Sequence, residues 1–367
     1  MKATIERRSP VPTGFRSAKV QGLFDLPRRT EEILTWDVDL PIEGMDWSVG
    51  AIVGASGTGK STLAAELWPK AYVRGHRWRA DCLLDDFPEA LSPQDITQAL
   101  SAVGFSSPPA WLRPYRVLST GQQFRSDLAR ALLAQDLVVY DEFTSVVDRT
   151  VAKAASVAVG KYVRREGKRF VAVTCHRDVL PWLEPDWWYD TDSATFRRER
   201  LQRPPLSLAI REGSRAAWPI FRPHHYLARD LSPAARVFLA YLELDGVERL
   251  AGMYSLIPAM GMRGWWRSHR TVVLPDFQGL GIGNGLEDRM PEVLWRQEGK
   301  RVRDPTAAVA LVHHRRRRPH MWRLVRGPSM MTPSHNRRQH VVTSAGRLTT
   351  TWEYVPEALR RERCDLC

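Results

Sequence analysis

The feature that most constrains the fold is a glycine-rich loop between a short apolar run and a helix-like segment. Residues 49–53 read VGAIV, the composition of a buried strand, and 54–61 follow as G-x-x-x-x-G-K-S before the helix-like TLAAELW. Glycines at these positions let backbone N–H groups turn inward around phosphate oxygens at the start of a helix. The sequence therefore predicts a phosphate-binding loop on an α/β sheet.

Each position of the loop has an expected part in holding ATP and Mg²⁺. Lys60 is expected to reach the β- and γ-phosphates, and the Ser61 hydroxyl is expected to bind Mg²⁺. The residues expected to contact the nucleotide are Gly54, Ser56, Gly57, Gly59, Lys60, Ser61 and Thr62.

Two further apolar strands bring chemistry to the same edge of the predicted sheet. The strand 137–140 ends in Asp141 and Glu142, and acidic residues at the end of a buried parallel strand lie beside the phosphate loop. Asp141 is expected to orient Mg²⁺, and Glu142 is expected to polarise the attacking water. The strand 170–174 leads to His176, a candidate sensor of the γ-phosphate, with a purely structural histidine as the alternative.

The segment between the loop and the acidic strand narrows the class of ATPase. Residues 118–122 read LSTGQ before the helix-like FRSDLARALLA, and SVVD follows at 145–148. These segments resemble the signature loop and the D-loop of ABC ATPases, with threonine at the third signature position where the family usually has glycine. The resemblance implies that Ser119, Gly121 and Gln122 complete the ATP site of a second subunit, in a homodimer closed by two ATP molecules.

Two features argue against a transporter ATPase. Only 58 residues, 61–118, separate Lys60 from Ser119, which is shorter than in transporter ATPases, and Gln94 and Gln98 are weak candidates for the glutamine that couples to membrane domains. The chain also has no run of about 18 apolar residues, the length that spans a membrane. We therefore expect no membrane association and no transmembrane partner subunit.

The N-terminus and the cysteines indicate a cytoplasmic protein. The first residues, MKATIERRSPVP, carry charge with no apolar core behind it, unlike a secretory signal. The four cysteines suit a reducing compartment better than a disulfide scaffold. Cys364 and Cys367 have CxxC spacing, but one pair cannot fill a four-ligand zinc site. A frayed tail with two thiols is the interpretation we prefer.

Positive charge is concentrated in the second half of the chain. The net charge is +13; residues 1–200 hold 27 Lys and Arg against 26 Asp and Glu, and residues 201–367 hold 27 against 15. In the second half every basic residue except Lys300 is arginine, whose planar guanidinium binds phosphate through two hydrogen bonds. This asymmetry predicts a polyanionic partner, with solvated surface charge as the alternative.

A second glycine-rich loop follows an apolar run in this basic half. The strand-like 270–274 leads through PDF into Gln278, Gly279, Leu280, Gly281, Ile282 and Gly283, and then into the helix-like NGLEDRMPEVLWRQ. This segment resembles motif A of GNAT acyltransferases. The resemblance implies that these six residues bind the pyrophosphate of acetyl-CoA, or of another acyl-CoA, at a helix N-terminus. The alternatives are a tight strand–helix turn and, less favoured without a second βα unit, a nicotinamide-dinucleotide site.

Segments along almost the whole chain resemble one family. They are VGFSSPPAWLRPYRVLSTGQQFRSDLARALL, DEFTSVVDRTVAK, VAVTCHRD, PDWWYD, HHYLA and HRTVVLPDFQGLGIG. The family joins an ABC-type ATPase to a predicted acetyltransferase domain and is known from bacteria and their phages. Its second half is similar to the Mom-like acyltransferases, which modify DNA bases.

The predicted fold class is therefore α/β, with a P-loop ABC-type ATPase domain followed by a GNAT-like α+β acyltransferase domain. A segment rich in tryptophan, aspartate, arginine and proline at 182–205 marks the boundary. We predict an ATPase domain at 1–195, a linker at 196–205, an acyltransferase domain at 206–357 and a tail at 358–367.

Acyl transfer to an amine needs a base for the amine and an acid for the leaving thiolate. The candidates are His224, His225, Tyr226 and Asp276. For the adjacent histidines the alternatives are a metal site with a carboxylate, and a helix cap or surface feature. Tyr226 could equally lie in the core.

A run of arginines follows the short apolar stretch AAVALV. Arginines beside an aromatic residue suit phosphate contact and base stacking, and the candidates for DNA contact are Arg315, Arg316, Arg317, Arg318, Arg323 and Arg326. Some of them could instead serve the phosphates of coenzyme A. Trp265 and Trp266, with Arg263 and Arg267, form either a second contact loop or core packing.

Three functions remain open on the sequence. The leading hypothesis is a two-domain enzyme whose ATPase acts as a switch and whose transferase half places an acyl group on a DNA base or another bound polymer. The second is an ATP-regulated N-acetyltransferase of proteins or small amines. The third is a non-enzymatic DNA-binding ABC module.

Overall fold

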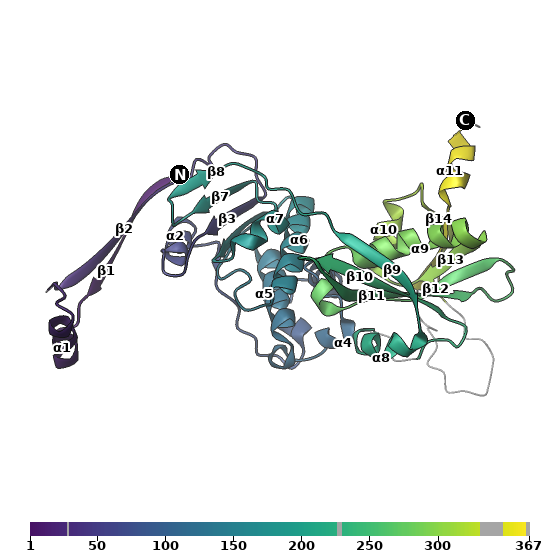
Figure 1. Cartoon of the computed structure of the whole chain (residues 1–367), viewed down its shortest axis with the longest axis horizontal. Coiled ribbons are helices and arrows are strands. Elements are labelled where there is room, and N and C mark those ends of the chain that lie inside the picture. Colours follow the sequence, from purple (N-terminus) through teal and green to yellow (C-terminus); the bar gives the residue numbers. More distant parts are fainter. Residues whose placement is uncertain (28, 226–229, 331–347, 365–367) are drawn as a thin grey trace. The chain divides into compact units, whose positions relative to one another are not determined.

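The computed structural model describes residues 1–27, 29–225, 230–330 and 348–364 (Figure 1). The chain forms two compact units. Unit 1 comprises Met1–Trp78 and Ser126–Pro204, and unit 2 comprises Arg79–Arg125 and Pro205–Cys367. Both units mix helices and strands, so the predicted α/β fold class is confirmed.

Unit 1 contains a six-stranded sheet in the order β4-β5-β6-β3-β7-β8, parallel except for β8. Its strands are β3 (Val49–Val53), β4 (Tyr72–Val73), β5 (Leu137–Tyr140), β6 (Arg169–Thr174), β7 (Trp187–Asp190) and β8 (Thr195–Arg197). The continuous apolar runs of β3, β5 and β6 suit strands covered on both faces. These three strands are the ones predicted from the sequence, and their positions are confirmed.

The helices of unit 1 cover this sheet and close its core. They are α2 (Lys60–Leu67), α6 (Arg149–Glu166), the short α7 (Leu180–Leu183) and the later part of α5 (Thr120–Ala134), within which the unit boundary falls. Trp187 is fully buried and packs edge-on against Trp47, with ring centroids 5.4 Å apart. A Cβ on Gly50 would lie 2.2 Å from the Trp187 ring, so only glycine fits there.

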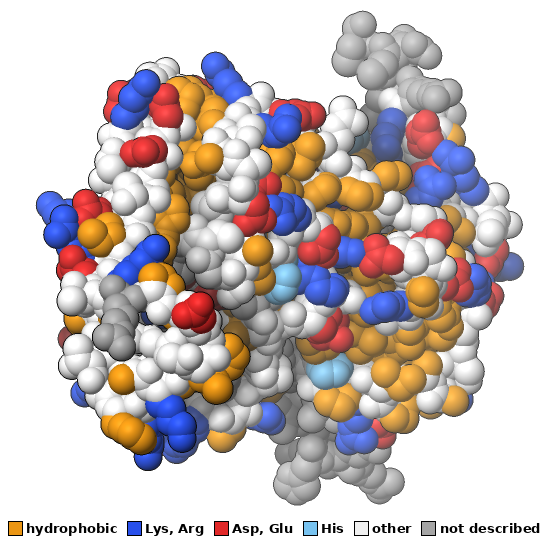
Figure 2. All heavy atoms as spheres, turned by 60° about the vertical axis from the view of Figure 1, so that its left-hand side comes forward, with side chains coloured by type: hydrophobic (Ala, Val, Ile, Leu, Met, Phe, Trp, Pro, Cys, Tyr) orange, Lys and Arg blue, Asp and Glu red, His pale blue; other side chains and the backbone are white. Residues whose placement is uncertain are grey.

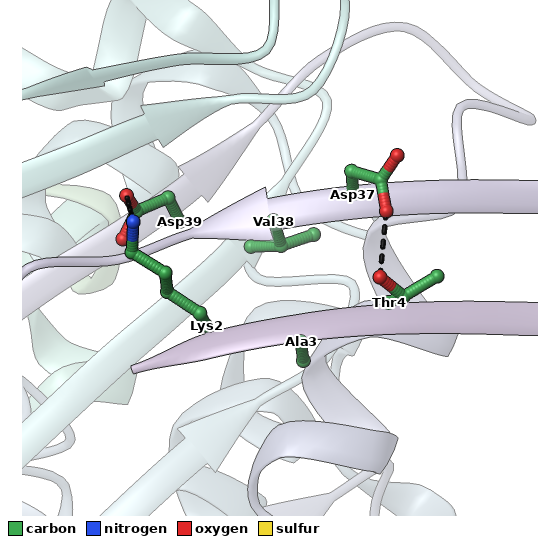
Figure 3. A pocket seen from close by; sticks show the side chains of 6 residues that line it. All are labelled: Lys2, Ala3, Thr4, Asp37, Val38 and Asp39. Carbon is green, nitrogen blue, oxygen red and sulfur yellow. Dashed lines mark hydrogen bonds and ion pairs between the residues drawn. The ribbon is translucent and has the colours of Figure 1, made fainter.

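A two-stranded arm extends from unit 1 (Figure 1). It consists of β1 (Lys2–Pro10), the helix α1 (Phe15–Leu23) and β2 (Glu31–Asp39), with β1 and β2 antiparallel. Figure 3 shows two cross-strand pairs at its base: Thr4 donates to Asp37 at 2.7 Å, and the Lys2 ammonium lies 3.0 Å from Asp39. Ile5 joins the core of unit 1 and anchors the arm.

Unit 2 contains a seven-stranded sheet in the order β14-β15-β13-β12-β11-β10-β9. Every neighbouring pair is antiparallel except β12 and β13. The strands are β9 (Ser207–Gly213), β10 (Arg236–Leu244), β11 (Val247–Pro258), β12 (Trp265–Val273), β13 (Arg301–Thr306), β14 (Trp322–Met330) and β15 (Leu348–Tyr354). Asp245 and Gly246 both have positive φ and make the tight turn between β10 and β11.

Helices lie on both faces of this sheet. The helices of unit 2 are α3 (Pro93–Ala102), α4 (Pro108–Trp111), the start of α5, α8 (Trp218–Phe221), α9 (Ile282–Glu298), α10 (Val309–Arg316) and α11 (Glu357–Cys364). Gly252 of β11 faces Ile282 of α9, whereas the next residue, Met253, packs with Trp218 of α8. Because successive strand residues point to opposite faces, α9 and α8 cover opposite faces of the sheet.

A buried cluster of charges fixes α9 and α10 to the sheet. The Arg315 guanidinium donates to Glu287 at 3.0 Å and to Asp304 at 2.6 Å, and it lies 4.0 Å from the centre of the Trp322 ring. Ser268 and Thr271 of β12 also donate to Glu287. Burial is the main cause that raises the pKa of Glu287 to about 7; the Arg315 cation opposes the rise, and the nearby Asp304 contributes to it.

The buried Glu287 predicts a pH-dependent stability. The pKa of Glu287 is higher in the folded chain than the ordinary 4.5. Its contribution to the free energy of unfolding is therefore complete below pH 4.5 and is lost as the pH rises through about 7. The shift corresponds to about 3 kcal/mol. Glu287→Gln, which carries no charge, should therefore raise the melting temperature relative to the unmodified protein at about pH 8. The difference should shrink at about pH 5.

Thermal unfolding of the full chain at the two pH values measures this effect. Glu298→Gln, a half-exposed acid at the end of the same helix, is the matched control and should show no such pH dependence. An equal change in melting temperature at both pH values for Glu287→Gln would exclude the titration of this carboxyl.

Candidate functional site

The phosphate loop of unit 1 connects β3 to α2 through left-handed glycines. Gly57 and Gly59 have φ values of 84° and 87°, and Gly59 is the residue directly before α2. The first N–H groups of a helix have no partner within the helix and therefore face the loop. The buried Lys60 donates from Nζ to the Ala55 carbonyl at 2.5 Å, which holds its ammonium across the loop.

The two residues predicted to bind Mg²⁺, Ser61 and Asp141, are hydrogen-bonded to each other. Ser61 Oγ donates to Asp141 Oδ1 at 2.9 Å, and Tyr72 donates to Asp141 Oδ2 at 2.5 Å. Burial raises the pKa of Tyr72 to about 12, with Asp141 as the next cause, so the phenol stays protonated as the donor. A hydroxyl and a carboxylate oxygen are ligands that suit Mg²⁺ together with substrate phosphates.

The residues after β5 adopt a strained conformation that orients the other catalytic candidates. Glu142 and Thr144 have φ values of 51° and 71°, which side chains other than glycine rarely adopt. Ser145 Oγ donates to Glu142 at 2.5 Å, and Thr144 Oγ1 lies 3.2 Å from His176 Nδ1 in a hydrogen bond. Burial lowers the pKa of His176, and the Arg149 cation adds to this effect, so the ring is neutral near pH 7.

Two contacts at the end of β7 were missed by sequence reasoning. Asp192 accepts from the Ala55 N–H at 3.0 Å, and Thr191 lies 2.6 Å from Thr58. Arg177 in turn binds Asp192 at 2.5 Å. The signal that could have found them is the polar run of Asp190, Thr191 and Asp192 at the end of an aromatic strand.

Trp36 of β2 was also missed. A Cβ on Gly59 would lie 2.5 Å from the Trp36 ring, so the ring rests directly against the phosphate loop. A flat aromatic surface beside bound phosphates suits stacking of a nucleotide base. Because Trp36 lies far ahead of the loop in the sequence, no local motif indicated it.

The predicted signature residues form the start of α5. Ser119 N–H donates to Gln122 Oε1 at 3.1 Å, and Gln122 N–H donates to Ser119 Oγ at 3.3 Å. This reciprocal cap explains the spacing of the serine and the glutamine. Gly121 lies in the first turn of the same helix, where the helix dipole favours an anion.

The second glycine loop repeats the geometry of the first. Gly279 and Gly281 have φ values of 96° and 91°, and Gly281 directly precedes α9. Leu280 and Ile282 are buried, so their side chains fasten the loop to the core. Gly283 follows in the first turn of α9, whose N–H groups are open to an anion by the same argument as in α2.

The side chain of Gln278 holds the loop in place. Its Nε2 donates to the Val273 carbonyl at 3.0 Å, and its Oε1 accepts from the Ser106 N–H at 2.8 Å. Both ends of the amide are therefore used by the protein.

The strands β12 and β13 diverge after the first two residues of β12. Their parallel register covers only Trp265 with Arg301 and Trp266 with Val302, among residues that the structure describes throughout. Beyond this point β12 pairs with β11, and β13 pairs with β15. The register of β12 also skips His269, a bulge that lets Ser268 and Thr271 face the same side.

Two of the predicted acid and base candidates, His224 and His225, follow α8 directly in the chain. Burial lowers the pKa of His224, and the Asp276 carboxylate opposes this, so the two lie within electrostatic reach of each other. His225 packs against Trp218, with ring centroids 5.9 Å apart. Tyr226 lies outside the described residues. Within the described ranges, no group of three or more His, Cys, Asp or Glu side chains is arranged to hold a metal ion.

His269 is a further histidine that the sequence did not single out. Its Nε2 accepts from the Ser232 N–H at 3.1 Å. Burial is the largest cause that lowers the pKa of His269 to about 4, and the nearby Arg270, Arg267 and His225 contribute to the same shift. It therefore stays neutral at pH 7.

The predicted DNA-contacting arginines separate into buried and exposed residues. Arg315 is fully buried in the cluster with Glu287 and Asp304 and has no surface to offer, which corrects its prediction. Arg318 is half-buried and pairs with Asp288 at 3.1 Å. The exposed members of the predicted set are Arg316, Arg317, Arg323 and Arg326. On the face drawn in Figure 2, basic and acidic side chains are interspersed, so net charge alone does not locate a binding surface.

One predicted pair lies partly outside the described residues. Cys367 lies outside them, so the CxxC pair has no structural description. Within the part of the chain that is described, no helix is long and apolar enough to cross a membrane.

Solved structures of two kinds are similar to parts of the chain. A dimeric bacterial ABC transporter cassette is 18% identical over 43% of this chain and 87% of its own, with a TM-score of 0.34. CbiO1 of Clostridium perfringens, part of the ABC transporter complex CbiONQ, is 16% identical over 44% and 78%, with a TM-score of 0.34. IAA acetyltransferase from Bacillus cereus is 14% identical over 41% and 100%, with a TM-score of 0.28. No family model and no curated protein matches the chain.

The position of Trp36 predicts its effect on nucleotide binding. Trp36→Ala should weaken ATP binding about 10-fold, since base–aromatic stacking contributes roughly 1–3 kcal/mol. Trp36→Phe, which keeps a flat ring, should lose much less. Calorimetric titration with ATP and ADP measures both. Equal affinity of Trp36→Ala and the unmodified protein for ATP would show that the ring only packs against the loop.

Proposed function

We propose that this chain hydrolyses ATP in unit 1 and transfers an acyl group from an acyl-CoA in unit 2, with DNA as the acceptor. The observation that carries the proposal is the complete set of polar groups at the first loop. The loop's Ser61 is bonded to Asp141 at the end of β5, and Glu142 and His176 are oriented directly beside it.

The residues of unit 1 support ATP hydrolysis in defined roles. Lys60 and the N–H groups of α2 would bind the β- and γ-phosphates, and Ser61 and Asp141 would hold Mg²⁺. The metal ion would supply neutralisation of the charge that develops on the phosphates. Glu142 would orient the attacking water and accept its proton, and the neutral His176 would bind the γ-phosphate oxygens.

The start of α5 supports assembly on ATP. Ser119 is exposed at a capped helix N-terminus, where it and the first N–H groups suit a terminal phosphate. We infer a homodimer in which Ser119 of each chain reaches the nucleotide bound by the other. A cytoplasmic protein without transmembrane subunits is the arrangement we propose.

The second loop supports the use of an acyl-CoA. The N–H groups at Gly281 to Gly283 would bind its pyrophosphate, and the divergence of β12 from β13 would leave backbone groups for the acyl arm. The acceptor amine would form a bond to the thioester carbonyl carbon as the carbon–sulfur bond breaks. His224, supported by Asp276, would take the amine proton and then deliver it to the leaving thiolate, so that no net proton is released.

A basic second half supports a DNA acceptor. Residues 201–367 carry 27 basic residues against 15 acidic ones, and Arg316, Arg317 and Arg326 are exposed. An N-acetyltransferase of proteins or small amines is the second candidate, favoured by the same cofactor loop. It predicts nucleic-acid binding that is weak and insensitive to salt.

The position of Glu142 predicts a trapped ATP-bound state. Glu142→Gln should bind ATP normally but lower kcat on the order of 100-fold or more, because an amide cannot accept the proton of the attacking water. ATP should then hold the dimer together for longer. Phosphate release and size-exclusion chromatography with ATP measure the two effects.

The exposed Glu166 at the end of α6 supplies the control, and Glu166→Gln should leave both unchanged. An ATPase rate unaffected by Glu142→Gln would remove this residue from catalysis.

The second loop predicts which glycine coenzyme A binding requires. Gly281→Ala should abolish binding, because φ near 91° strains any residue with a Cβ. Gly285→Ala, one turn later with open space around its Cβ, is the matched control and should bind normally. Calorimetry with acetyl-CoA measures the loss, and no heat with the unmodified protein would instead favour a non-enzymatic DNA-binding module.

Mass spectrometry of nucleosides from cells expressing the protein tests the acceptor. A modified nucleoside that disappears with Gly281→Ala supports DNA as the acceptor. Unchanged nucleosides alongside active coenzyme A binding would favour a protein or a small amine.

A further inference from the structure

Three arginines of unit 2 share a single buried carboxylate. Arg301 and Arg303 of β13 and Arg323 of β14 all bond to Glu353 of β15. The Arg303 and Arg323 contacts measure 3.1 Å and 3.0 Å, and the Glu353 side chain is only 1% exposed. One guanidinium would suffice to neutralise this carboxylate.

The cluster therefore carries two surplus positive charges. The arginine side chains remain 35%, 30% and 46% exposed, so their outer N–H groups can reach a ligand. Like charges held around one point repel each other, and the repulsion is stronger near protein than in bulk water. An anion bound beside the cluster would relieve it.

A tryptophan lies within the same cluster. Trp265 pairs in register with Arg301, and the Arg301 and Arg303 guanidinium carbons lie 4.4 Å and 4.7 Å from the centre of its ring. Stacking on the ring fixes the planes of both guanidinium groups, and planar arginine pairs well with phosphate. The Trp265 side chain is half-buried, so it is not fully enclosed in the core.

These side chains form a row across one face of the sheet. Val302 and Asp304 are buried, with Asp304 bonded to Arg315 of α10, so the alternating Arg301 and Arg303 point to the opposite face. The register pairs both Arg303 and Arg323 with Glu353, and it pairs Arg326 with Thr351. The row crosses four strands that lie about 4.8 Å apart, and it is therefore about 14 Å long.

The row lies at the other end of β12 from the glycine loop. Trp265 begins this nine-residue strand, and the loop containing Gly281 follows its end. Nine residues at about 3.3 Å each separate the two by about 30 Å. The pyrophosphate held at the loop is therefore not the anion that this row would bind. The divergence of β12 from β13 lies between the two ends.

We propose that the row Arg301, Arg303, Arg323 and Arg326, with Trp265, binds the phosphate backbone of a single nucleic-acid strand. This rests on the proposed function, whose acceptor it locates. The acyl-CoA would approach the divergent strands from the glycine loop, and the acceptor strand would approach from the arginine row. A base has to leave the duplex stack before its amine can be acylated, which favours a single strand.

The salt dependence of binding by the full-length protein tests the row. The probe is a fluorescein-labelled single-stranded DNA of about 30 nucleotides, followed by anisotropy between about 50 and 200 mM salt. The double variant R301Q/R303Q keeps Arg323 on Glu353. Log affinity falls as log salt rises, and the variant should make this fall less steep by about 1.4, because each single-strand phosphate contact contributes about 0.7 to the steepness.

Arg211→Gln is the matched control. Arg211 also stacks on an aromatic ring, at 4.8 Å from Tyr241, and also pairs with a glutamate, Glu248, but it lies on β9. Its loss should leave the slope unchanged. An unchanged slope for a folded R301Q/R303Q would overturn the proposal and leave the proposed function standing.

Two other outcomes are decisive. Glu353→Gln removes the carboxylate and should steepen the slope; if R301Q/R303Q does not fold, an unchanged slope in Glu353→Gln overturns the proposal instead. If the unmodified protein hydrolyses ATP and binds coenzyme A but binds no DNA, the DNA acceptor itself is wrong.

Discussion

Both units depend on a left-handed glycine at the junction of a strand and a helix. Gly59 connects β3 to α2, and Gly281 connects β12 to α9, with φ values of 87° and 91°. Only glycine adopts this conformation without strain, and it turns the chain so that the first helical N–H groups face one point. The polar residues around each loop matter for binding because they surround the point that these N–H groups face.

The parts of each site that lie close together in sequence could be predicted. A strand, a glycine loop and a helix follow one another in both units, and Asp141 and Glu142 directly follow their strand. The residues that were missed come from pairings between distant segments. Trp36 reaches the first loop from the arm, and Asp192 reaches it from β7. The direction of Gln278 depends on the Ser106 backbone, far away in the chain.

The arginines show why composition predicts a class of partner better than it predicts contacts. Four consecutive arginines at 315–318 pass around a helix end, so they cannot all face the same way. Arg315 points inward to two acids, whereas Arg316 and Arg317 are exposed. In contrast, Arg301 and Arg303 are spaced two apart on a strand, which places both on one face. The spacing of arginines along an element, and not the local density of charge, decides which of them share a face.

The buried cluster around Glu287 matters more for the positions of β12 and β13 than for the stability of the fold. Two carboxylates and one guanidinium removed from water often stabilise a fold less than apolar residues of the same size would. Nε and Nη1 of Arg315 are also buried without a hydrogen-bond partner in the described part of the chain. What the cluster does provide is position. Glu287 binds Ser268 and Thr271 on either side of the β12 bulge, and Arg315 ties the same carboxylate to Asp304 of β13. The cluster thus joins both strands where they separate.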